Sequence, residues 1–405
     1  MFMGNVIVAQ SGGPTVAINA SLAGVIEGTI GSNYDKIYGS INGILGIRDD
    51  NIIDLSSIVA NDPHFLKRLK TTPAMYLGSC RFKLPSIDSE DPIYNTLFDQ
   101  FKKYQIEAFF YIGGNDSMDT VDKLSAYASK IGSKIRFVGV PKTVDNDLCV
   151  TDHTPGFGSA AKYIATSTME VIFDAQIYDN PSVTIIEVMG RDAGWLTAAT
   201  SLAKTDCCDG PDLIYLPEVP FDKAKFIEDL KRLLKEKTNV VVAVSEGIRD
   251  ANGEYISAST GTLDNFGHAQ LSGAGKTLEY LVKDALGVKV RSIEVNVLQR
   301  AAAHMSSLTD INESEAIGKK AVNIAEEGVT GAMVTMERIS NAPYEIKFDY
   351  AKIHDIANEA KEVPMSWINS SHNGVTSDMV NYLQPLVIGL PDVEYKNGLP
   401  VYVSR

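Results

Sequence analysis

Short apolar runs alternate with amphipathic stretches along most of this chain. An apolar run of roughly four to eight residues is typical of a strand buried on both faces, and apolar residues three or four positions apart are typical of a helix. The runs that predict strands are 5–10, 35–40, 108–112, 137–140, 183–188, 213–216, 239–244 and 290–298. The stretches that predict helices are 18–26, 94–104, 118–131, 160–173, 193–203, 221–236, 278–286 and 350–360. This order of strand, loop and helix predicts an α/β fold with parallel sheets.

The layout of strand, loop and helix occurs in both halves of the chain, with different loops. The 405 residues suit two domains better than one core. A glycine-containing segment at 155–158 lies between the two halves. We therefore expect two α/β domains with a boundary near this segment.

Composition narrows the partners that we expect. The net charge of −14 argues against a general nucleic-acid partner, which needs a basic face, but it leaves room for a local basic pocket that binds an anionic substrate. The four cysteines form no CxxC pair, so a reducing cytoplasm is the expected compartment. The N-terminal apolar run has no basic region before it, and no stretch approaches the ~20 apolar residues of a membrane span. We expect neither a signal peptide nor a membrane partner.

Charged side chains follow the apolar run 137–140. Lys142, Thr143, Asp145 and Asp147 come directly after Pro141, which has no N–H for strand pairing. In an open α/β sheet, ligands bind at the carboxyl ends of the strands. One lysine with two carboxylates suits a charged, metal-bearing ligand. The alternative is a solvated loop in which Asp and Asn form turns.

Two glycine loops each lie between a predicted strand and a predicted helix. They are Ser11-Gly12-Gly13 and the segment 113–117, which contains Asn115 and Asp116. Glycines let a phosphate approach the backbone, and the helix N-terminus favours an anion. The carboxylate of Asp116 would repel a phosphate unless a cation such as Mg²⁺ lies between them. The alternatives are a tight turn for the first loop and helix capping for the second.

Further charges follow other predicted strands. They are Arg81, Arg191, Glu246, Arg291 and Arg300. Arginines suit phosphate through bidentate contacts, and a carboxylate suits sugar hydroxyls. Each could also be a surface charge or a structural ion pair, and their shared position after strands is what favours a site.

Seven motifs, taken in order, resemble those of the phosphofructokinases. They are SGG (11–13), LGSCRF (77–82), IGGNDS (112–117), PKTVDND (141–147), EVMGR (187–191), SEG (245–247) and QR (299–300). The resemblance implies two similar Rossmann-like three-layer domains with the active site in the cleft between them. It implies Mg²⁺-dependent phosphorylation of the 1-hydroxyl of fructose 6-phosphate in glycolysis, and a homo-oligomer, either a dimer or a tetramer.

The resemblance also assigns residue roles. Asp145 is the expected general base, with Lys142, Asp116 and Thr143 as its catalytic partners. The residues expected to bind the sugar phosphate are Thr143, Asp145, Asp147, Met189, Gly190, Arg191, Glu246, Arg291 and Arg300. Those expected to bind the phosphoryl donor are Gly12, Gly13, Arg81 and Lys142, and those expected to hold the metal are Asn115, Asp116 and Asp147. The donor domain is expected over 1–157 plus about 298–350, the sugar-phosphate domain over 158–297, and a C-terminal extension that packs on both over 351–405.

Two positions indicate the phosphoryl donor. The ATP-using branch of the family has glycine at the positions of Asp116 and Lys142, whereas the pyrophosphate-using branch has Asp and Lys, as here. Asp116 places a carboxylate where the α-phosphate of ATP would lie, and Lys142 neutralises the charge of a small diphosphate. We therefore expect diphosphate as donor and a reversible reaction. The alternatives are an ATP-dependent kinase and a non-catalytic, sugar-phosphate-binding regulatory paralogue.

Three positions depart from the family pattern. Asn115 replaces a metal-ligating Asp of many members, and Ser182 and Val297 replace an arginine and a histidine that contact the sugar phosphate in bacterial ATP enzymes. Arg291 keeps the position of an arginine that crosses to a neighbouring subunit. A related sugar phosphate, such as sedoheptulose 7-phosphate, could fit the same pocket.

Overall fold

The first sheet of the protein contains strands from both ends of the chain. The computed structural model describes residues 4–89, 91–257, 273–355 and 360–404. The strands of this sheet are β1 (Asn5–Gln10), β2 (Ile37–Ser40), β3 (Ile52–Asp54), β4 (Ile106–Gly113), β5 (Arg136–Pro141), β12 (Ala332–Asn341) and β13 (Tyr344–Lys352). Their order is β13–β12–β5–β4–β1–β2–β3, and β3 and β13 at the two edges pair antiparallel to their neighbours. The strands between them are parallel, which places the ends of β1, β4 and β5 at one edge.

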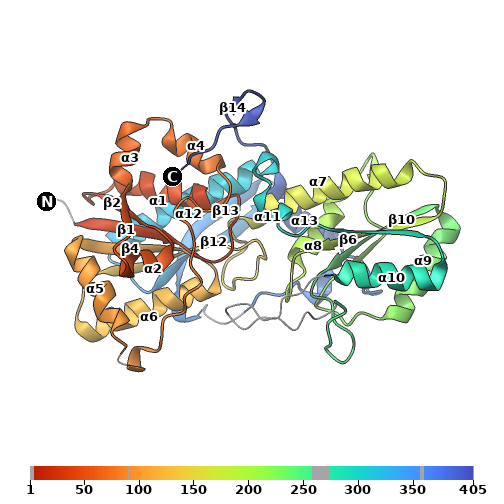
Figure 1. Cartoon of the computed structure of the whole chain (residues 1–405), viewed down its shortest axis with the longest axis horizontal. Helices are drawn as coiled ribbons and strands as arrows, with labels where there is room; N and C mark the ends of the chain where they lie inside the picture. Colours follow the sequence, from red (N-terminus) through yellow and green to blue (C-terminus); the bar gives the residue numbers. More distant parts are fainter. Residues whose placement is uncertain (1–3, 90, 258–272, 356–359, 405) are drawn as a thin grey trace.

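Helices cover both faces of the first sheet (Figure 1). These helices are α1 (Ile18–Ile30), α2 (Gly43–Arg48), α3 (Leu55–Asn61), α4 (Phe65–Thr71), α5 (Ile93–Lys103), α6 (Asn115–Ile131) and α12 (Leu308–Glu326). Successive residues of β1 point to opposite faces: Val6 and Val8 pack with α1 and α12, whereas Ile7 and Ala9 pack with α5 and α6. Burial on both faces explains why β1 is a continuous apolar run.

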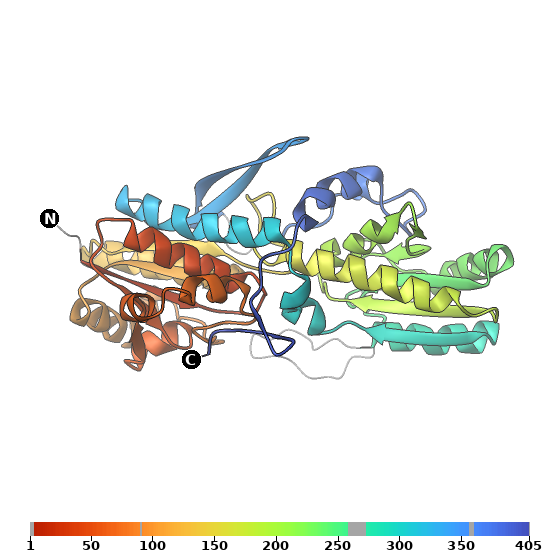
Figure 2. The same cartoon turned by 90° about the horizontal axis from the view of Figure 1, so that it is seen from above.

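The second sheet is smaller and fully parallel. Its strands are β6 (Ser182–Val188), β9 (Leu213–Tyr215), β10 (Asn239–Ser245) and β11 (Lys289–Glu294), in the order β11–β6–β10–β9. The long helices around it are α7 (Phe157–Gln176), α9 (Lys223–Glu236) and α10 (Ala274–Leu286). The shorter helices are α8 (Trp195–Ala199), α11 (Leu298–Ala301) and α13 (Ser377–Leu383). Ile186 and Val188 pack with α7, α8 and α13, and Val183 and Ile185 pack with α9 and α10. In both views the two sheets lie in separate halves of the molecule (Figures 1 and 2).

The predicted fold class is confirmed, since both halves are three-layer α/β units with parallel strands. The division of the chain into the three expected domain ranges stays a prediction. None of the helices in the described ranges has the length and apolar character that a membrane span requires.

Two local predictions differ from the structure, and one hairpin was missed. The predicted helix 350–360 is wrong at its start, because Tyr350 and Lys352 belong to β13; residues 356–359 lie outside the described part of the chain. The predicted strand 290–298 ends at Glu294, and Leu298 begins α11. The hairpin of β12 and β13, which projects from the first sheet in Figure 2, was not predicted. Its second strand alternates apolar and polar residues, a two-residue period that marks a half-exposed strand.

Candidate active site

The loop after β5 carries the chemistry of the candidate site. β5 lies between β4 and β12, so its carboxyl end opens into the edge where β1 and β4 also end. The Asp145 backbone N–H donates to the Thr143 hydroxyl at 3.1 Å, which tightens the loop. Asn146 adopts a left-handed conformation, with φ 55°, between Asp145 and Asp147. A non-glycine residue is uncommon in the left-handed region of backbone conformation. The turn at Asn146 separates the carboxylates of Asp145 and Asp147 along the chain.

Lys142 links this loop to the glycine loop after β1. Its side chain is 3% exposed, and its Nζ donates to the Gly13 carbonyl at 2.7 Å. A Cβ added to Gly12 would lie 3.2 Å from the same Nζ, so glycine is what allows the ammonium to come this close. Burial lowers the pKa of Lys142 to about 8, although the charges of Asp145 and Asp147 oppose this shift.

The two carboxylates of the loop are half-buried and lie near other charged groups. Burial, followed by the charges of Asp147 and Glu246, raises the pKa of Asp145 to about 7. Lys142 and Arg191 act in the opposite direction. Burial also raises the pKa of Asp147, against a hydrogen bond from the Thr143 side chain. A carboxyl group with a pKa near neutrality is suited to take up and release a proton.

The second sheet contributes a facing set of loops. Gly190 follows β6 with φ 136°, and its N–H donates to Glu246 Oε1 at 3.3 Å. The Met189 N–H donates to Gln299 Oε1 at 3.2 Å. Burial raises the pKa of Glu246, and the charges of Arg191 and Arg300 oppose that shift. These contacts bring the end of β6 close to the end of β10 and to the start of α11.

Arg300 lies between the two sets of loops. A Cβ added to Gly13 would lie 3.2 Å from Arg300 Nη1, so the guanidinium sits beside the first glycine loop. Its charge also acts on Lys142 and on Glu246, which belong to different sheets. The structure thus brings together predicted site residues from both sheets, at the carboxyl ends of their strands.

Asn115 and Asp116 begin α6, next to the Lys142 loop. The Lys142 N–H donates to the Gly113 carbonyl at 3.0 Å, which fixes the ends of β4 and β5 side by side. Asn115 Oδ1 is buried and has no hydrogen-bond partner within the described ranges, whereas Asp116 is exposed. In the same ranges, no three His, Cys, Asp or Glu side chains come together as a metal cage. Amide and carboxylate oxygens still fit Mg²⁺, since this ion takes one or two carboxylates and completes its shell with water and phosphate.

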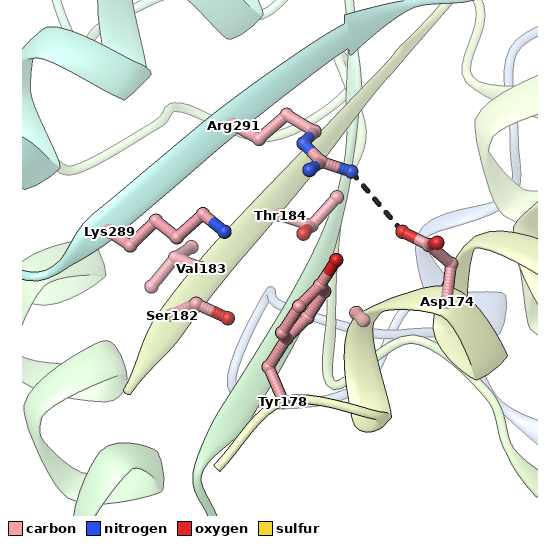
Figure 3. Close-up of a pocket in the computed structure, with 8 residues that line it drawn as sticks. Asp174, Tyr178, Ser182, Val183, Thr184, Lys289 and Arg291 are labelled. Carbon is pink, nitrogen blue, oxygen red and sulfur yellow. Dashed lines mark hydrogen bonds and ion pairs between the residues drawn. The ribbon is translucent and has the colours of Figure 1, made fainter. Parts of the chain in front are cut away.

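Arg291 lies apart from these loops within the single chain. It pairs with Thr184 across the sheet, four residues before the end of β6, which corresponds to about 13 Å along the strand. It lines a pocket with Ser182 and Lys289, and it forms an ion pair with Asp174 at 3.2 Å (Figure 3). Within one chain Arg291 therefore lies away from the loops described above, and its contact with the sugar phosphate stays a prediction. Arg81 is exposed and Val297 is 49% exposed.

Some residues that support the site loops through hydrogen bonds could not be found from the sequence. Gln299 was noted only as part of a motif, although it fixes Met189. Tyr382 and Lys361 contact the Asp145 loop from the C-terminal part of the chain. No local pattern could have indicated them, because a hydrogen bond across more than 200 residues leaves no trace in periodicity.

Known proteins resemble this chain over its full length. A family model described as phosphofructokinase matches residues 5–325. A pyrophosphate–fructose 6-phosphate 1-phosphotransferase of Xanthomonas campestris is 42% identical over 100% of this chain and 96% of its own length. One from Halomonas elongata is 40% identical over 98% and 94% of the two chains. The crystal structure of a pyrophosphate-dependent phosphofructokinase from Nitrosospira multiformis superposes with a TM-score of 0.88, at 39% identity, over 98% of this chain and 95% of that one.

Proposed function

Because this chain belongs to the phosphofructokinase family, we propose that it transfers a phosphoryl group reversibly from diphosphate to the 1-hydroxyl of fructose 6-phosphate. The products are fructose 1,6-bisphosphate and phosphate. The observation that carries this proposal is the buried Lys142 ammonium, which lies against the Gly12–Gly13 loop and in the same loop as Asp145. This arrangement supports a small anionic donor beside a base.

We assign the proton transfer to Asp145. In the forward direction its carboxylate accepts the proton of the sugar 1-hydroxyl while that oxygen bonds to the nearer phosphorus of diphosphate. The bond from this phosphorus to the bridging oxygen breaks, and its electron pair leaves with phosphate. In the reverse direction the protonated Asp145 returns the proton to the sugar oxygen. A pKa of about 7 supports both roles at neutral pH.

We assign the charges around the donor to the two glycine loops and their neighbours. Gly12 and Gly13 let the diphosphate approach the backbone, Lys142 neutralises its charge, and Arg81 contacts it from the loop at 77–82. Asn115, Asp116 and Asp147 would hold Mg²⁺, which supplies positive charge to the diphosphate oxygens when bound. Asn115 Oδ1 is buried and has no hydrogen-bond partner among the residues that the structure describes, which supports this assignment.

We place the sugar phosphate against the loops of the second sheet. Thr143, Met189, Gly190, Arg191 and Glu246 would contact the sugar, and Arg300 its 6-phosphate. Arg291 would reach this ligand only from a neighbouring copy, so the assignment goes together with a homo-oligomer. We propose the same division for the domains, with the donor on 1–157 plus about 298–350 and the sugar phosphate on 158–297. We propose a cytoplasmic location.

The choice of donor rests on Lys142 and Asp116. Lys142 Nζ lies beside Gly12, 3.2 Å from where a Cβ would be, and would there neutralise the charge of a small diphosphate. Asp116, exposed at the start of α6, adds charge repulsion against a nucleotide. Together the two residues favour diphosphate over ATP.

The test is a donor comparison with the purified full chain, Mg²⁺ and fructose 6-phosphate. We expect fructose 1,6-bisphosphate from diphosphate, the reverse reaction from phosphate, and little turnover with ATP. Faster turnover with ATP than with diphosphate would overturn the donor assignment. No turnover with either donor would overturn the proposed reaction.

A variant separates the two donor residues. Asp116→Gly removes the repulsion against a nucleotide but leaves Lys142 in place, so we expect it to gain only weak ATP activity. Asp122→Gly, on the same helix, measures the effect of a glycine in α6 by itself. An efficient ATP-dependent Asp116→Gly enzyme would show that Lys142 does not determine the donor.

A further inference from the structure

The C-terminal part of the chain contacts the Asp145 loop directly. Ala360 forms an antiparallel bridge with Leu148, and the Lys361 N–H donates to the Asp147 carbonyl at 2.9 Å. The helix that follows, α13, lies in the half of the molecule that contains the second sheet (Figure 1). The loop that carries the base is therefore held by residues that come more than 200 positions later in the sequence.

Asn146 connects the C-terminal part of the chain to Asp145, the proposed base. It lies between Asp145 and Asp147 and is fully buried. Its Nδ2 donates to the Tyr382 hydroxyl at 2.9 Å. The left-handed backbone of Asn146 costs free energy unless its surroundings hold it, and it sets the directions in which the neighbouring carboxylates leave the chain.

The Tyr382 hydroxyl has a fixed position. It donates to the Asp152 carbonyl at 2.6 Å while it accepts from Asn146. The ring packs against Trp195 and Trp367 at centroid distances of 5.3 and 5.2 Å, and the Arg338 guanidinium lies 4.4 Å from its centroid. The ring is 7% exposed. A hydroxyl held on this many sides is suited to fix Asn146 rather than to follow its movements.

Lys361 holds the far end of the same loop. Its Nζ donates to the carbonyls of Thr151, at 3.3 Å, and Asp152. The Lys361 carbonyl accepts from Trp195 Nε1 at 2.8 Å, and its ammonium lies 4.9 Å from the Trp195 ring. Loop residues 146–152 are thus tied to a tryptophan that follows the Met189–Arg191 loop of the second sheet.

We propose that Tyr382 is a positioning residue for Asp145, acting through the side chain of Asn146. The proposal rests on the proposed function, since it takes Asp145 as the general base. When the hydroxyl holds the Asn146 amide, Asp145 keeps the direction that proton transfer needs. When the hydroxyl is removed, the ring at position 382 still packs in place. The Asn146 side chain can then turn, and Asp145 moves with it.

The first test is Tyr382→Phe, which removes only the hydroxyl. We expect kcat to fall about tenfold, because small displacements of a catalytic group carry large rate penalties, while KM for both substrates changes little. Tyr344→Phe is the matched control: its hydroxyl donates to Glu313 Oε1 at 2.7 Å, and its ring faces the same Arg338 guanidinium. We expect this control to retain kcat. An unchanged kcat in Tyr382→Phe, or an equal loss in both variants, would overturn the proposal.

The second test is a double-mutant cycle with Asn146→Gly. Glycine accepts the left-handed backbone, so this variant removes the amide and keeps the turn. If Tyr382 acts through Asn146, adding Tyr382→Phe to Asn146→Gly lowers kcat no further. Independent, multiplying losses would overturn the proposal. Thermal unfolding of each variant shows whether its stability has changed. A variant that has only lost stability keeps its kcat at lower temperature, whereas a variant that has lost positioning does not.

Comparing the wild-type protein with Tyr382→Phe also distinguishes this proposal from the proposed function. Failure of the wild-type chain to convert fructose 6-phosphate with diphosphate would reject the reaction. Wild-type turnover with full activity in Tyr382→Phe would reject the positioning role alone.

Discussion

At the residue scale, the properties of the candidate site depend on a few charged side chains that have little contact with water. Lys142 and Asp145 are both held in surroundings that disfavour their charged forms, and each partly stabilises the other. A buried lysine has a lowered pKa and a buried carboxyl a raised one, so both groups titrate near neutral pH. This property suits a reversible reaction, because the same groups must serve in both directions.

The first prediction concerns the pH dependence of diphosphate binding. Lys142 has a pKa of about 8, so it loses its positive charge as pH rises through that value. We expect the affinity for diphosphate to fall above pH 8, measured by calorimetry at several pH values. Lys142→Arg keeps its charge well above pH 8, so its affinity should stay level there. Parallel losses in both proteins would show that another group controls binding.

The second prediction concerns the base. Asp145→Asn keeps the size of the side chain but cannot accept a proton, so we expect kcat to fall roughly 10²–10⁴-fold in the forward direction. The readout is the rate of fructose 1,6-bisphosphate formation from diphosphate. Asp192→Asn, an exposed carboxylate in the next loop that pairs with Arg249, is the control and should change the rate little. Comparable rates for Asp145→Asn and wild type would reject this base.

At the scale of elements, the close contact between helices α1 and α12 stabilises the first half of the molecule. α1 and α12 pack on one face of the first sheet, and they meet where each has a glycine. A Cβ added to Gly318 would lie 2.2 Å from the Ser21 carbonyl oxygen, and one added to Gly24 would lie 2.0 Å from that of Glu315. The two backbones therefore touch at a distance that leaves no room for a methyl group.

The third prediction follows from this contact. Alanine favours a helix by about 1 kcal/mol over glycine, yet we expect Gly318→Ala to lower the free energy of unfolding by roughly 1–3 kcal/mol, because the helices must move apart. The measurement is urea unfolding followed by circular dichroism. Asn323→Ala, at an exposed position of the same helix, should be neutral or slightly stabilising. A stabilised Gly318→Ala protein would contradict the close packing.

The C-terminal part of the chain joins both halves at the scale of the whole molecule. Met379, Leu383 and Leu386 are buried beside the second sheet. Further on, Asp392 pairs with Lys67, and the Val403 N–H donates to Thr72 Oγ1 in the first half. The first group of contacts is apolar and buried, whereas the Lys67–Asp392 pair is exposed and contributes little.

The fourth prediction compares two truncations. Removing residues 393–405 takes away the partly buried Val403 contact but keeps the Lys67–Asp392 pair, so we expect a small decrease in Tm and retained activity. Removing residues 377–405 also deletes three buried apolar side chains, each worth about 2–5 kcal/mol, so we expect loss of the folded protein. Thermal unfolding and solubility are the measurements. A stable, active 1–376 protein would contradict the structural role of α13.

The amino-acid sequence by itself determined most strands of the two sheets, the fold class and the loops that carry chemistry. A strand buried on both faces, such as β1 or β10, must be a continuous apolar run, and that signal is local. Parallel strands of one sheet end at a common edge, so the Gly12–Gly13 loop and the loop of Lys142 and Asp145 could be expected to converge. Glu246 follows a strand of the other sheet, and only the family resemblance implied that it joins them. The family resemblance that their motifs indicated is confirmed by the match over residues 5–325.

Only the tertiary structure decided how those groups are held and which candidates stay outside. Arg291 was grouped with Arg300 as a charge at a strand end, yet it lies within β11 beside Thr184, away from the loops that meet at the site. The Asn146–Tyr382 hydrogen bond joins residues 236 positions apart. Periodicity and motifs report neighbours along the chain, whereas such contacts depend on how whole elements pack, and for this reason the sequence alone could not predict them.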